Sequence, residues 1–281
     1  MQSLRGKVVV VTGAASGIGR ALSLILAGEG CCLAIADMNE EGLRETAAMA
    51  EKRGAAAMTC RLDVSAAEDV RGFAAGVVEK FGRVDIVINN AGITTVGVVD
   101  ETNHDGFKRV MEVNFWGVYN GVIAFLPYLR RQNAGRIVNI SSVFGLWGIP
   151  TQAAYNCSKF AVRGLSESLA QELAGTGVGV SCVYPGGIKT NIARSARFQQ
   201  SYGPLEDKEA FTKLFERLAL TTPEKAAAVI VKGIKSGRAR ILIGPDAYAM
   251  DVTQRLFPTL YQKIIPAVLK LRLITIPRPL K

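Results

Sequence analysis

The feature of this sequence that most constrains its fold is a regular alternation of short apolar runs with amphipathic stretches. Apolar runs bounded by glycine or polar turns are typical of buried strands, and apolar residues spaced three or four apart are typical of helices. Strands that alternate with helices indicate βαβ units and a parallel sheet. The strands predicted from this pattern are Lys7–Val11, Cys31–Ala36, Ala55–Leu62, Val84–Ile88, Arg136–Ile140, Val178–Tyr184 and Arg240–Ile243.

Helical spacing fills the intervals between these strands. The predicted helices are Ile18–Gly28, Glu40–Lys52, Ala66–Lys80, Asp105–Arg131, Ala153–Glu172 and Pro223–Lys235. Right-handed crossovers place such helices on both faces of the sheet, and ligands then bind beyond the carboxyl ends of the strands. We therefore expect an α/β fold with a single Rossmann-like, doubly wound parallel sheet of about seven strands.

One catalytic domain is expected over residues 1–245, because no repeat and no second core interrupts the pattern. Residues 186–218 lack the pattern, and a long segment of this kind favours a substrate lid. Residues 246–281 are expected to form a basic, amphipathic C-terminal extension.

Charge and cysteine content narrow the function classes. The net charge is +10, and six basic residues lie within 252–281, where no acid occurs. No nucleic-acid partner is expected, since the charge is concentrated in one segment and no nucleic-acid-binding module is visible. The five cysteines have neither disulfide-framework nor zinc-site spacing, so no metal is expected and a cytoplasmic location is favoured. No apolar stretch is long enough to span a bilayer.

A glycine-rich turn follows the first predicted strand and leads directly into a helix. Glycines let the backbone turn tightly and approach a ligand closely, and a helix N-terminus attracts a pyrophosphate. The strand–turn–helix context therefore favours a dinucleotide site, with a purely structural turn as the alternative. The cofactor contacts predicted here are Gly13, Ser16, Gly17, Ile18 and Gly19.

The second predicted strand is followed by Asp37, at about the spacing of 20 residues expected of a ribose-binding acid. A carboxylate there can accept hydrogen bonds from both adenosine ribose hydroxyls and would repel a 2′-phosphate. Met38 follows in place of a basic residue, and Ser16 precedes Gly17, so neither position offers a phosphate clamp. NAD is therefore expected as the cofactor rather than NADP. The alternative is that Asp37 only caps the next helix.

Short polar segments end the next two strands. Asp63 and Val64 follow the third strand, and Asn90, Ala91 and Gly92 follow the fourth. The carboxyl ends of parallel strands share one edge, so these residues are predicted to wall an adenine and ribose pocket. Taken singly, they are also ordinary turn formers.

Tyr155 and Lys159 lie four residues apart in a predicted helix, so their side chains share one face and can reach each other. A nearby ammonium group lowers the pKa of a tyrosine, so the pair can exchange a proton with an alcohol. Ser142 ends the fifth strand and can donate a hydrogen bond to a carbonyl oxygen beside Tyr155. Pro185 and Gly186 end the sixth strand at the same edge, which favours one catalytic crevice.

Asn114 and Thr190 complete a set of motifs that resembles the classical short-chain dehydrogenase/reductase family. The resemblance spans about Gly6 to Ile243 and rests on the glycine turn and the residues named above. It implies hydride transfer between a nicotinamide and an alcohol or ketone carbon, with the cofactor supplying the electronic chemistry. It also implies a homodimer or homotetramer built through the long helices that hold Asn114 and Tyr155.

The resemblance further implies a role for each matched residue. Tyr155 exchanges the substrate proton, Ser142 orients the substrate oxygen, and Lys159 holds the nicotinamide ribose. Asn114 holds a water that links Lys159 to solvent, and Thr190 binds the nicotinamide carboxamide. The cofactor contacts expected in this half of the site are Tyr155, Lys159, Pro185, Gly186, Ile188 and Thr190.

Apolar residues border the predicted nicotinamide pocket. Phe144 and Trp147 follow the catalytic serine, and Ile188 follows the proline–glycine turn. Such a pocket favours a lipophilic secondary alcohol or ketone, for example a cyclic alcohol or a steroid-like compound. The alternative for Phe144 and Trp147 is plain packing. The alternative function is a catalytically silent NAD-sensing regulator, since a fold does not establish turnover.

The C-terminal extension leaves three interpretations open. Its apolar residues interleave with basic ones and are interrupted by Pro258 and Pro266. It can cover the substrate pocket or a subunit interface, make a weak peripheral contact with an anionic membrane, or be disordered. His104, the only histidine, is expected to be a helix cap or surface residue rather than a catalyst.

Overall fold

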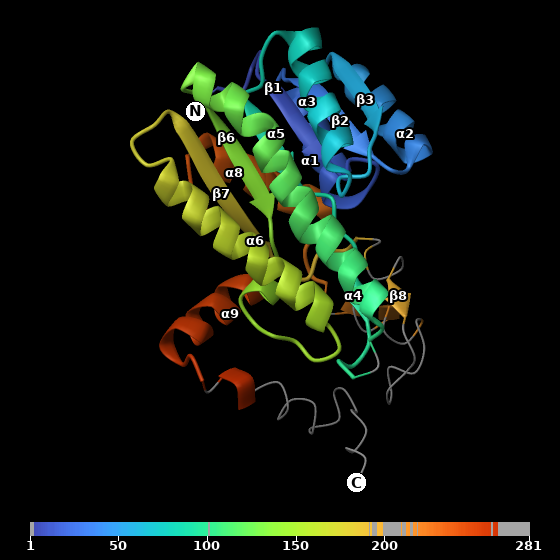
Figure 1. Ribbon diagram of the computed structural model, residues 1–281, viewed down its shortest axis with the longest axis vertical. Helices are drawn as coiled ribbons and strands as arrows, with labels where there is room; N and C mark the ends of the chain where they lie inside the picture. Colours follow the sequence, from blue (N-terminus) through green and yellow to red (C-terminus); the bar gives the residue numbers. More distant parts are fainter. Residues whose placement is uncertain are drawn as a thin grey trace.

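The computed structural model describes residues 3–100, 102–190, 192, 196–198, 209, 212–213, 216–217, 219–259 and 261–263. A parallel sheet forms the middle layer, and helices cover both of its faces (Figure 1). The strands of this sheet are β1 (Val8–Thr12), β2 (Cys32–Asp37), β3 (Ala57–Arg61), β4 (Ile86–Asn89), β6 (Gly135–Ile140), β7 (Val178–Pro185) and β9 (Arg240–Ile243). The α-helices are α1 (Gly17–Gly28), α2 (Glu40–Glu51), α3 (Ala67–Phe81), α4 (His104–Met111), α5 (Gly117–Gln132), α6 (Ala153–Glu172), α8 (Pro223–Lys235) and α9 (Pro245–Leu256).

The main sheet has seven strands in the order β3-β2-β1-β4-β6-β7-β9, and each neighbouring pair is parallel. This topology confirms the predicted doubly wound fold. The chain order reverses direction at β1, which lies between β2 and β4, and ligands bind beyond the strand ends at such a switch point. A second, two-stranded sheet joins β5 (Thr95–Val96) to β8 (Arg197–Phe198). Strands of two residues are too short for a periodic pattern to predict them.

Alternating side chains of the central strands belong to two separate cores. Val9 and Val11 of β1 pack with residues of α1, α2 and α8, whereas Val8 and Val10 pack with residues of α3, α5 and α6. All four side chains are nearly inaccessible to solvent. A strand buried on both faces has a continuous apolar sequence rather than an alternating one, which explains why β1 was recognisable.

The long helix predicted over residues 105–131 is interrupted. The structure has α4, then a π-helical turn, η1 (Glu112–Trp116), and then α5. Both ends of the prediction lie within one residue of the observed ends, His104 and Gln132. The break is not visible in an apolar pattern because all three pieces continue one helical path. A π-turn changes the direction in which its side chains point and often occurs at functional sites. Asn114 lies inside this turn.

The predicted boundary between residues 245 and 246 falls within the first turn of α9, which packs on the body of the protein. Trp147 Nε1 donates a hydrogen bond to the backbone oxygen of Met250 (2.9 Å), and the Trp147 ring lies 4.9 Å from that of Tyr261. The start of the predicted extension is thus part of the fold. Residues 264–281 and most of the predicted lid lie outside the described residues. No helix in the described part is long and apolar enough to cross a membrane.

Asp85, the residue before β4, is a buried carboxylate that binds the start of β1 and the loop before β4. Its oxygens accept hydrogen bonds from the Val8 backbone N–H (2.9 Å), Lys7 Nζ (3.0 Å) and Arg83 Nε (2.9 Å). Burial raises the pKa of Asp85, but the hydrogen bonds from Val8, Arg83 and Lys7 outweigh it and lower the pKa below its usual value. The ionised carboxylate therefore stabilises the fold.

We expect Asp85→Asn to lower the free energy of unfolding at pH 7 by about 1–3 kcal/mol, because the charged acceptor of the hydrogen bonds from Lys7, Val8 and Arg83 becomes a neutral amide. A depressed folded-state pKa gives stability above the unfolded pKa that is lost as the pH falls through the folded one. The difference from wild type should therefore stay constant from pH 7 to about pH 5 and shrink as the pH falls below about 4 in urea titrations. Glu79→Gln, at an exposed site on α3, is the control. A difference that does not change with pH would contradict this account.

Candidate active site

The turn between β1 and α1 is shaped by glycines that leave no room for side chains. A Cβ on Gly13 would lie 2.8 Å from the Ala91 Cα, and one on Gly19 would overlap the backbone oxygen of Gly13. Gly17 has φ +53°, which favours glycine. Ser16 is the N-cap of α1 and, in the described part of the chain, makes no side-chain capping bond. The N–H groups of the first turn are therefore available to an anion such as a pyrophosphate.

The segment after β4 is fastened to this turn. The Asn90 side chain donates hydrogen bonds to the backbone oxygens of Thr12 (2.9 Å) and Gly13 (3.1 Å). The backbone N–H groups of Asn90 and Ala91 both donate to Thr12 Oγ1. Asn90, Ala91 and Gly92 therefore lie beside the glycine turn, as the sequence predicts, and Asn90 acts on the backbone of the turn.

Asp37 links the end of β2 to the glycine turn. Its Oδ2 accepts a hydrogen bond from the Ala15 backbone N–H (3.0 Å), and its Oδ1 accepts one from the Asn39 N–H (2.9 Å). The N-cap of α2 is Asn39, whose side chain accepts from the Gly42 N–H. The alternative in which Asp37 caps this helix is therefore wrong. Its carboxylate lies at the edge where an adenosine ribose would be bound.

Asp63 has a protein partner that the sequence did not reveal. Its Oδ2 accepts a hydrogen bond from Arg109 of α4 (2.7 Å), and its Oδ1 accepts from the Ser65 N–H and hydroxyl. Burial raises the pKa of Asp63, but the hydrogen bonds from Ser65 and Arg109 lower it below its usual value. The ionised carboxylate thus ties the end of β3 to α4. Val64 is buried and packs against Gly117, where a Cβ would lie 3.0 Å from the Val64 Cβ.

Ser142 and Tyr155 meet beyond the end of β6. A hydrogen bond from Ser142 to Tyr155 acts to lower the pKa of the phenol. The Phe144 ring packs edge-on against the Tyr155 ring at a centroid separation of 5.8 Å. Ser142 is also the N-cap of the short 3-10 turn η2 (Val143–Gly145), where its oxygen accepts from the Phe144 N–H (3.1 Å). Phe144 therefore lies at the predicted site.

Lys159 lies one helical turn after Tyr155 and is almost fully buried. Its Nζ donates a hydrogen bond to the backbone oxygen of Ile140 (2.9 Å) and lies 5.4 Å from the centre of the Tyr155 ring. A Cβ on Gly92 would lie 3.6 Å from that nitrogen. Lys159 of α6 is therefore brought next to the ends of two strands, β6 at Ile140 and the segment after β4 at Gly92.

Asn114 is fixed by three hydrogen bonds at the same place. Its Oδ1 accepts from the Ile93 N–H (2.8 Å), and its Nδ2 donates to the Ile93 oxygen (2.9 Å) and Ser158 Oγ (3.1 Å). A Cβ on Gly92 would lie 3.3 Å from Asn114 Oδ1, close to the Lys159 amine. The π-turn thus binds the segment after β4 to the helix that holds Tyr155.

Burial changes the pKa values of the tyrosine and the lysine in opposite directions. It raises the pKa of Tyr155 to about 12, against the opposing effect of the Ser142 hydrogen bond. It lowers the pKa of Lys159 to about 8. The sequence predicts a lowered tyrosine pKa, and the difference arises because burial penalises the phenolate more than its surroundings stabilise it. Near neutral pH the pair is a phenol beside an ammonium group.

The turn after β7 lies against both α9 and the glycine turn. The Gly187 backbone N–H donates a hydrogen bond to Asp246 Oδ2 (2.7 Å), and a Cβ on Gly17 would lie 3.2 Å from the Thr190 side chain. Ile188 is buried nearby. Pro185, Gly186, Ile188 and Thr190 thus occupy the predicted edge of the sheet. Asp246 was missed because nothing in its local sequence marks it as part of the site.

Trp147, Phe144 and His104 lie in different surroundings in the structure. Trp147 is buried against α9, so plain packing accounts for it, whereas Phe144 lies beside Tyr155. His104 is the first residue of α4, and Asn103 is the N-cap, so the histidine is at a helix start as expected.

Cys157 is exposed, which differs from the buried position typical of a free cysteine.

The chain is similar to known short-chain dehydrogenases in sequence and in structure. Residues 7–201 match a family model described as short chain dehydrogenase. A protein named SadH from Mycobacterium tuberculosis is 47% identical over 270 residues, covering 95% of this chain and 96% of the relative. A short-chain dehydrogenase/reductase from Burkholderia phymatum, solved in complex with NAD, is 32% identical with a TM-score of 0.84 and covers 100% of both chains. An alcohol dehydrogenase from Thermococcus sibiricus, complexed with 5-hydroxy-NADP, is 29% identical with a TM-score of 0.72, covering 85% of this chain and 96% of that one.

The family match spans more than half of the chain, and the 47% identity to SadH extends over nearly all of both proteins. The strand order of the sheet and the similarity to solved short-chain dehydrogenase structures support the same family. The chain is therefore an oxidoreductase that belongs to the short-chain dehydrogenase/reductase family.

Proposed function

We propose that this protein is an NAD-linked enzyme that interconverts a lipophilic secondary alcohol and its ketone. The observation that supports this most directly is the meeting of Ser142, Tyr155 and Lys159 at the same sheet edge as the glycine turn. The glycine turn fits a dinucleotide, because its glycines let a ligand approach the backbone closely. The turn leads into the N-terminus of α1, where no side chain caps the helix and the backbone N–H groups can bind a pyrophosphate. When bound there, the nicotinamide supplies hydride acceptance and donation.

The protein side chains supply binding, orientation and proton transfer. Tyr155 Oη exchanges the proton with the substrate oxygen, and Ser142 Oγ holds that oxygen in place by a hydrogen bond. Lys159 contributes a positive charge that favours the phenolate and binds the ribose beside the nicotinamide. Asn114 fixes the segment after β4 next to Lys159 and holds a water on the path by which the lysine exchanges protons with solvent.

The choice of NAD over NADP rests on Asp37. Its carboxylate lies at the end of β2 beside the glycine turn, where a 2′-phosphate would meet a negative charge. Met38, the next residue, is 48% exposed and offers no cation to bind a phosphate. The solved relatives include one in complex with NAD and one with an NADP derivative, so the family alone does not decide the cofactor.

The substrate class rests on the surroundings of Tyr155. The Phe144 ring packs against the phenol, and Ile188 follows the turn that faces the glycine loop. Apolar side chains at these positions favour a lipophilic carbon skeleton over a polyol. Residues 186–218, most of which lie outside the described part, are proposed as the lid over this pocket.

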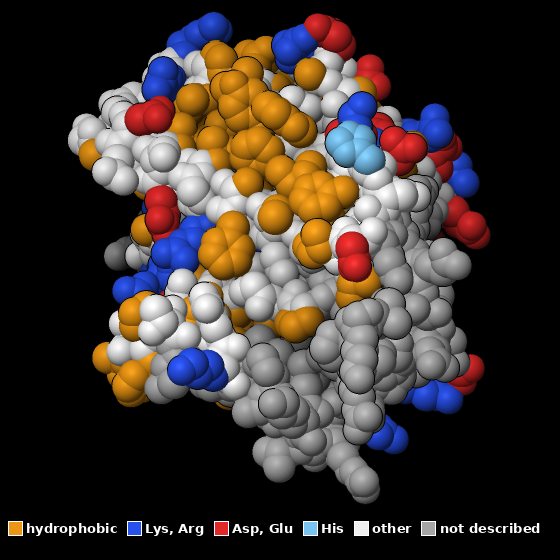
Figure 2. Space-filling view, turned by 60° about the horizontal axis from the view of Figure 1, so that its bottom comes forward, with side chains coloured by type: hydrophobic (Ala, Val, Ile, Leu, Met, Phe, Trp, Pro, Cys, Tyr) orange, Lys and Arg blue, Asp and Glu red, His pale blue; other side chains and the backbone are white. Residues whose placement is uncertain are grey.

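A homodimer or homotetramer is proposed through the helices around Asn114 and Tyr155. Four large hydrophobic side chains are exposed there on η1, α5 and α6, and hydrophobic side chains gather on the face shown in Figure 2. An exposed apolar surface of this kind favours association between copies of the chain. The four residues are Trp116, Tyr119, Ile123 and Phe160.

A cytoplasmic location with weak peripheral membrane contact is also proposed. The outward side of α9 exposes Tyr248, Val252 and Leu256, and the chain from residue 252 onward holds six basic residues and no acid. An apolar face beside positive charge suits the surface of an anionic membrane. The same extension can instead cover the substrate pocket or a subunit interface. Flotation with anionic vesicles at low salt distinguishes these roles.

We expect Tyr155→Phe to reduce kcat by about 10²- to 10⁴-fold, because it removes only the proton-transfer group. The affinity for NADH, measured by fluorescence titration, should stay close to that of wild type. Tyr248→Phe, at an exposed tyrosine on α9, is the matched control and should retain full activity. Normal turnover by Tyr155→Phe would exclude the proposed mechanism.

We expect Asp37→Ala to shift the ratio of kcat/KM for NAD and NADP toward NADP, because the charge that repels a 2′-phosphate is removed. Asp37→Asn keeps an acceptor for the Ala15 N–H and therefore separates the loss of charge from loosening of the glycine turn. Both variants should show the shift. Unchanged selectivity in both would refute the role of Asp37.

The substrate class is tested by following NADH formation with 2-octanol, cyclohexanol and a hydroxysteroid, and with xylitol and sorbitol as polar controls. Turnover is expected with the lipophilic alcohols. Turnover of the sugar alcohols alone would contradict the apolar pocket. Tight NADH binding without turnover of any alcohol or of the matching ketones would favour the alternative, an NAD-sensing regulator.

A further inference from the structure

Asp246 is the residue through which α9 contacts the turn after β7. It lies in the first turn of α9, and its Oδ2 accepts a hydrogen bond from the Gly187 backbone N–H (2.7 Å). A side chain on Gly186 would overlap the same carboxylate. The φ angle of Gly186 is not in the left-handed region, so the need for glycine there is steric. The Asp246 carboxylate is therefore in close van der Waals contact with the backbone of the Gly186–Gly187 turn.

The turn held by Asp246 leads directly to the proposed cofactor site. Two backbone hydrogen bonds also fix this turn. The Gly186 N–H donates to the Ile243 oxygen (2.9 Å), and the Thr221 N–H donates to the Gly187 oxygen (3.2 Å). Three residues after Gly187, Thr190 lies against Gly17 of the glycine turn. A displacement of Gly187 is therefore passed to Thr190 over a short, tightly bonded segment.

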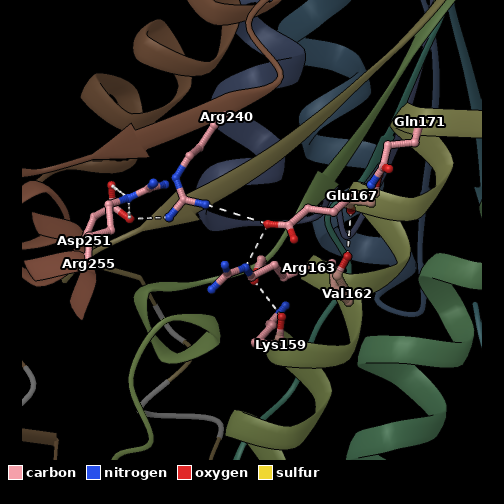
Figure 3. Close-up of polar contacts among 10 residues, drawn as sticks. Lys159, Val162, Arg163, Glu167, Gln171, Arg240, Asp251 and Arg255 are labelled. Carbon is pink, nitrogen blue, oxygen red and sulfur yellow. Dashed lines mark hydrogen bonds and ion pairs between the residues drawn. The ribbon is translucent and has the colours of Figure 1, made fainter. Parts of the chain in front are cut away.

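The helix that holds Asp246 is anchored independently of it. Asp251, further along α9, pairs with Arg240 of β9 and with Arg255 (3.1 Å). Figure 3 shows that Arg240 also faces Glu167 of α6, at 4.0 Å, and that Glu167 is in turn bonded to Arg163 (2.8 Å). This network joins α6, β9 and α9. The contact from Asp246 to Gly187 is therefore not needed to dock the helix.

We propose that Asp246 is a positioning residue of this active site. Its carboxylate sets the Gly186–Gly187 turn and so places Ile188 and Thr190 against the nicotinamide half of the cofactor site. In the described part of the chain, the hydrogen bond from the Gly187 N–H to Asp246 is the one that this turn makes with a side chain, and the donor of that bond belongs to the turn itself. The inference rests on the proposed function, because it assigns Asp246 to the placement of that same cofactor.

The test compares three variants of the full chain. In Asp246→Ala the Gly187 N–H loses its acceptor, and we expect NADH affinity and kcat/KM for NAD to fall by about 10- to 100-fold. Asp246→Asn still presents an oxygen to Gly187 and should recover most of this loss. Asp251→Ala loosens the anchoring of α9 without touching the turn, so it should lower the thermal midpoint but leave NADH affinity near wild type. NADH binding is followed by fluorescence and turnover with cyclohexanol or 2-octanol.

A double-mutant cycle tests the packing of the turn. Gly186→Ala places a methyl group where the Asp246 carboxylate lies, and NADH affinity should fall. In the Asp246→Ala background that space is open, so the same substitution should cost markedly less. Equal costs in the two backgrounds would mean that Asp246 does not set the position of the turn.

The outcomes separate the inference from the function on which it rests. If wild type binds no NADH, the proposed function fails. If wild type binds NADH and Asp246→Ala binds it equally well, the proposed function stands and the role of Asp246 is refuted. Equal losses of affinity in Asp246→Ala and Asp251→Ala would also refute it, because the effect would then come from docking of α9 in general.

Discussion

The parallel pairing of all seven strands is the constraint on which the rest of this structure depends. Each strand must be followed by a crossover, so every strand ends at the same edge of the sheet. At that edge the glycine turn follows β1, and the Asn90–Gly92 segment follows β4. Ser142 follows β6, and the Pro185–Gly186 turn lies at the end of β7. The strand order alone thus brings four segments that are far apart in the sequence to one edge. The hydrogen bonds from Asn90 to Thr12 and Gly13 then fix how two of them fit together.

Burial at this edge sets the protonation of the proposed proton-transfer pair. An ammonium group in a buried site is costly, and Lys159 keeps a hydrogen bond to the Ile140 oxygen while its pKa falls to about 8. The pKa of Tyr155 moves the other way, to about 12. At neutral pH the phenol therefore holds its proton and the lysine remains charged. This form suits proton donation to a ketone oxygen, and alcohol oxidation requires a further positive charge nearby to favour the phenolate.

Most of the fold could be predicted from the sequence because a strand buried on both faces and an amphipathic helix leave strong local patterns. Val8–Val11 is such a pattern, and so is the spacing of Tyr155 and Lys159. The π-turn at Asn114 could not be predicted, since its five residues continue the helical path on either side. The bond from Arg109 to Asp63 was also hidden, because it joins residues far apart in the sequence, and local patterns do not report such pairs.

The boundary predicted after residue 245 follows the last predicted strand, and α9 begins at that point and packs on the sheet. The two acids of α9, Asp246 and Asp251, both face inward and are bonded to the turn after β7 and to Arg240. The outward side of the helix is left with exposed apolar residues such as Val252 and Leu256. A segment that seems basic and separate in composition therefore begins with two acids that bind it to the sheet. The charges of α9 therefore bind its inner side to the sheet, and its outer side is exposed and apolar.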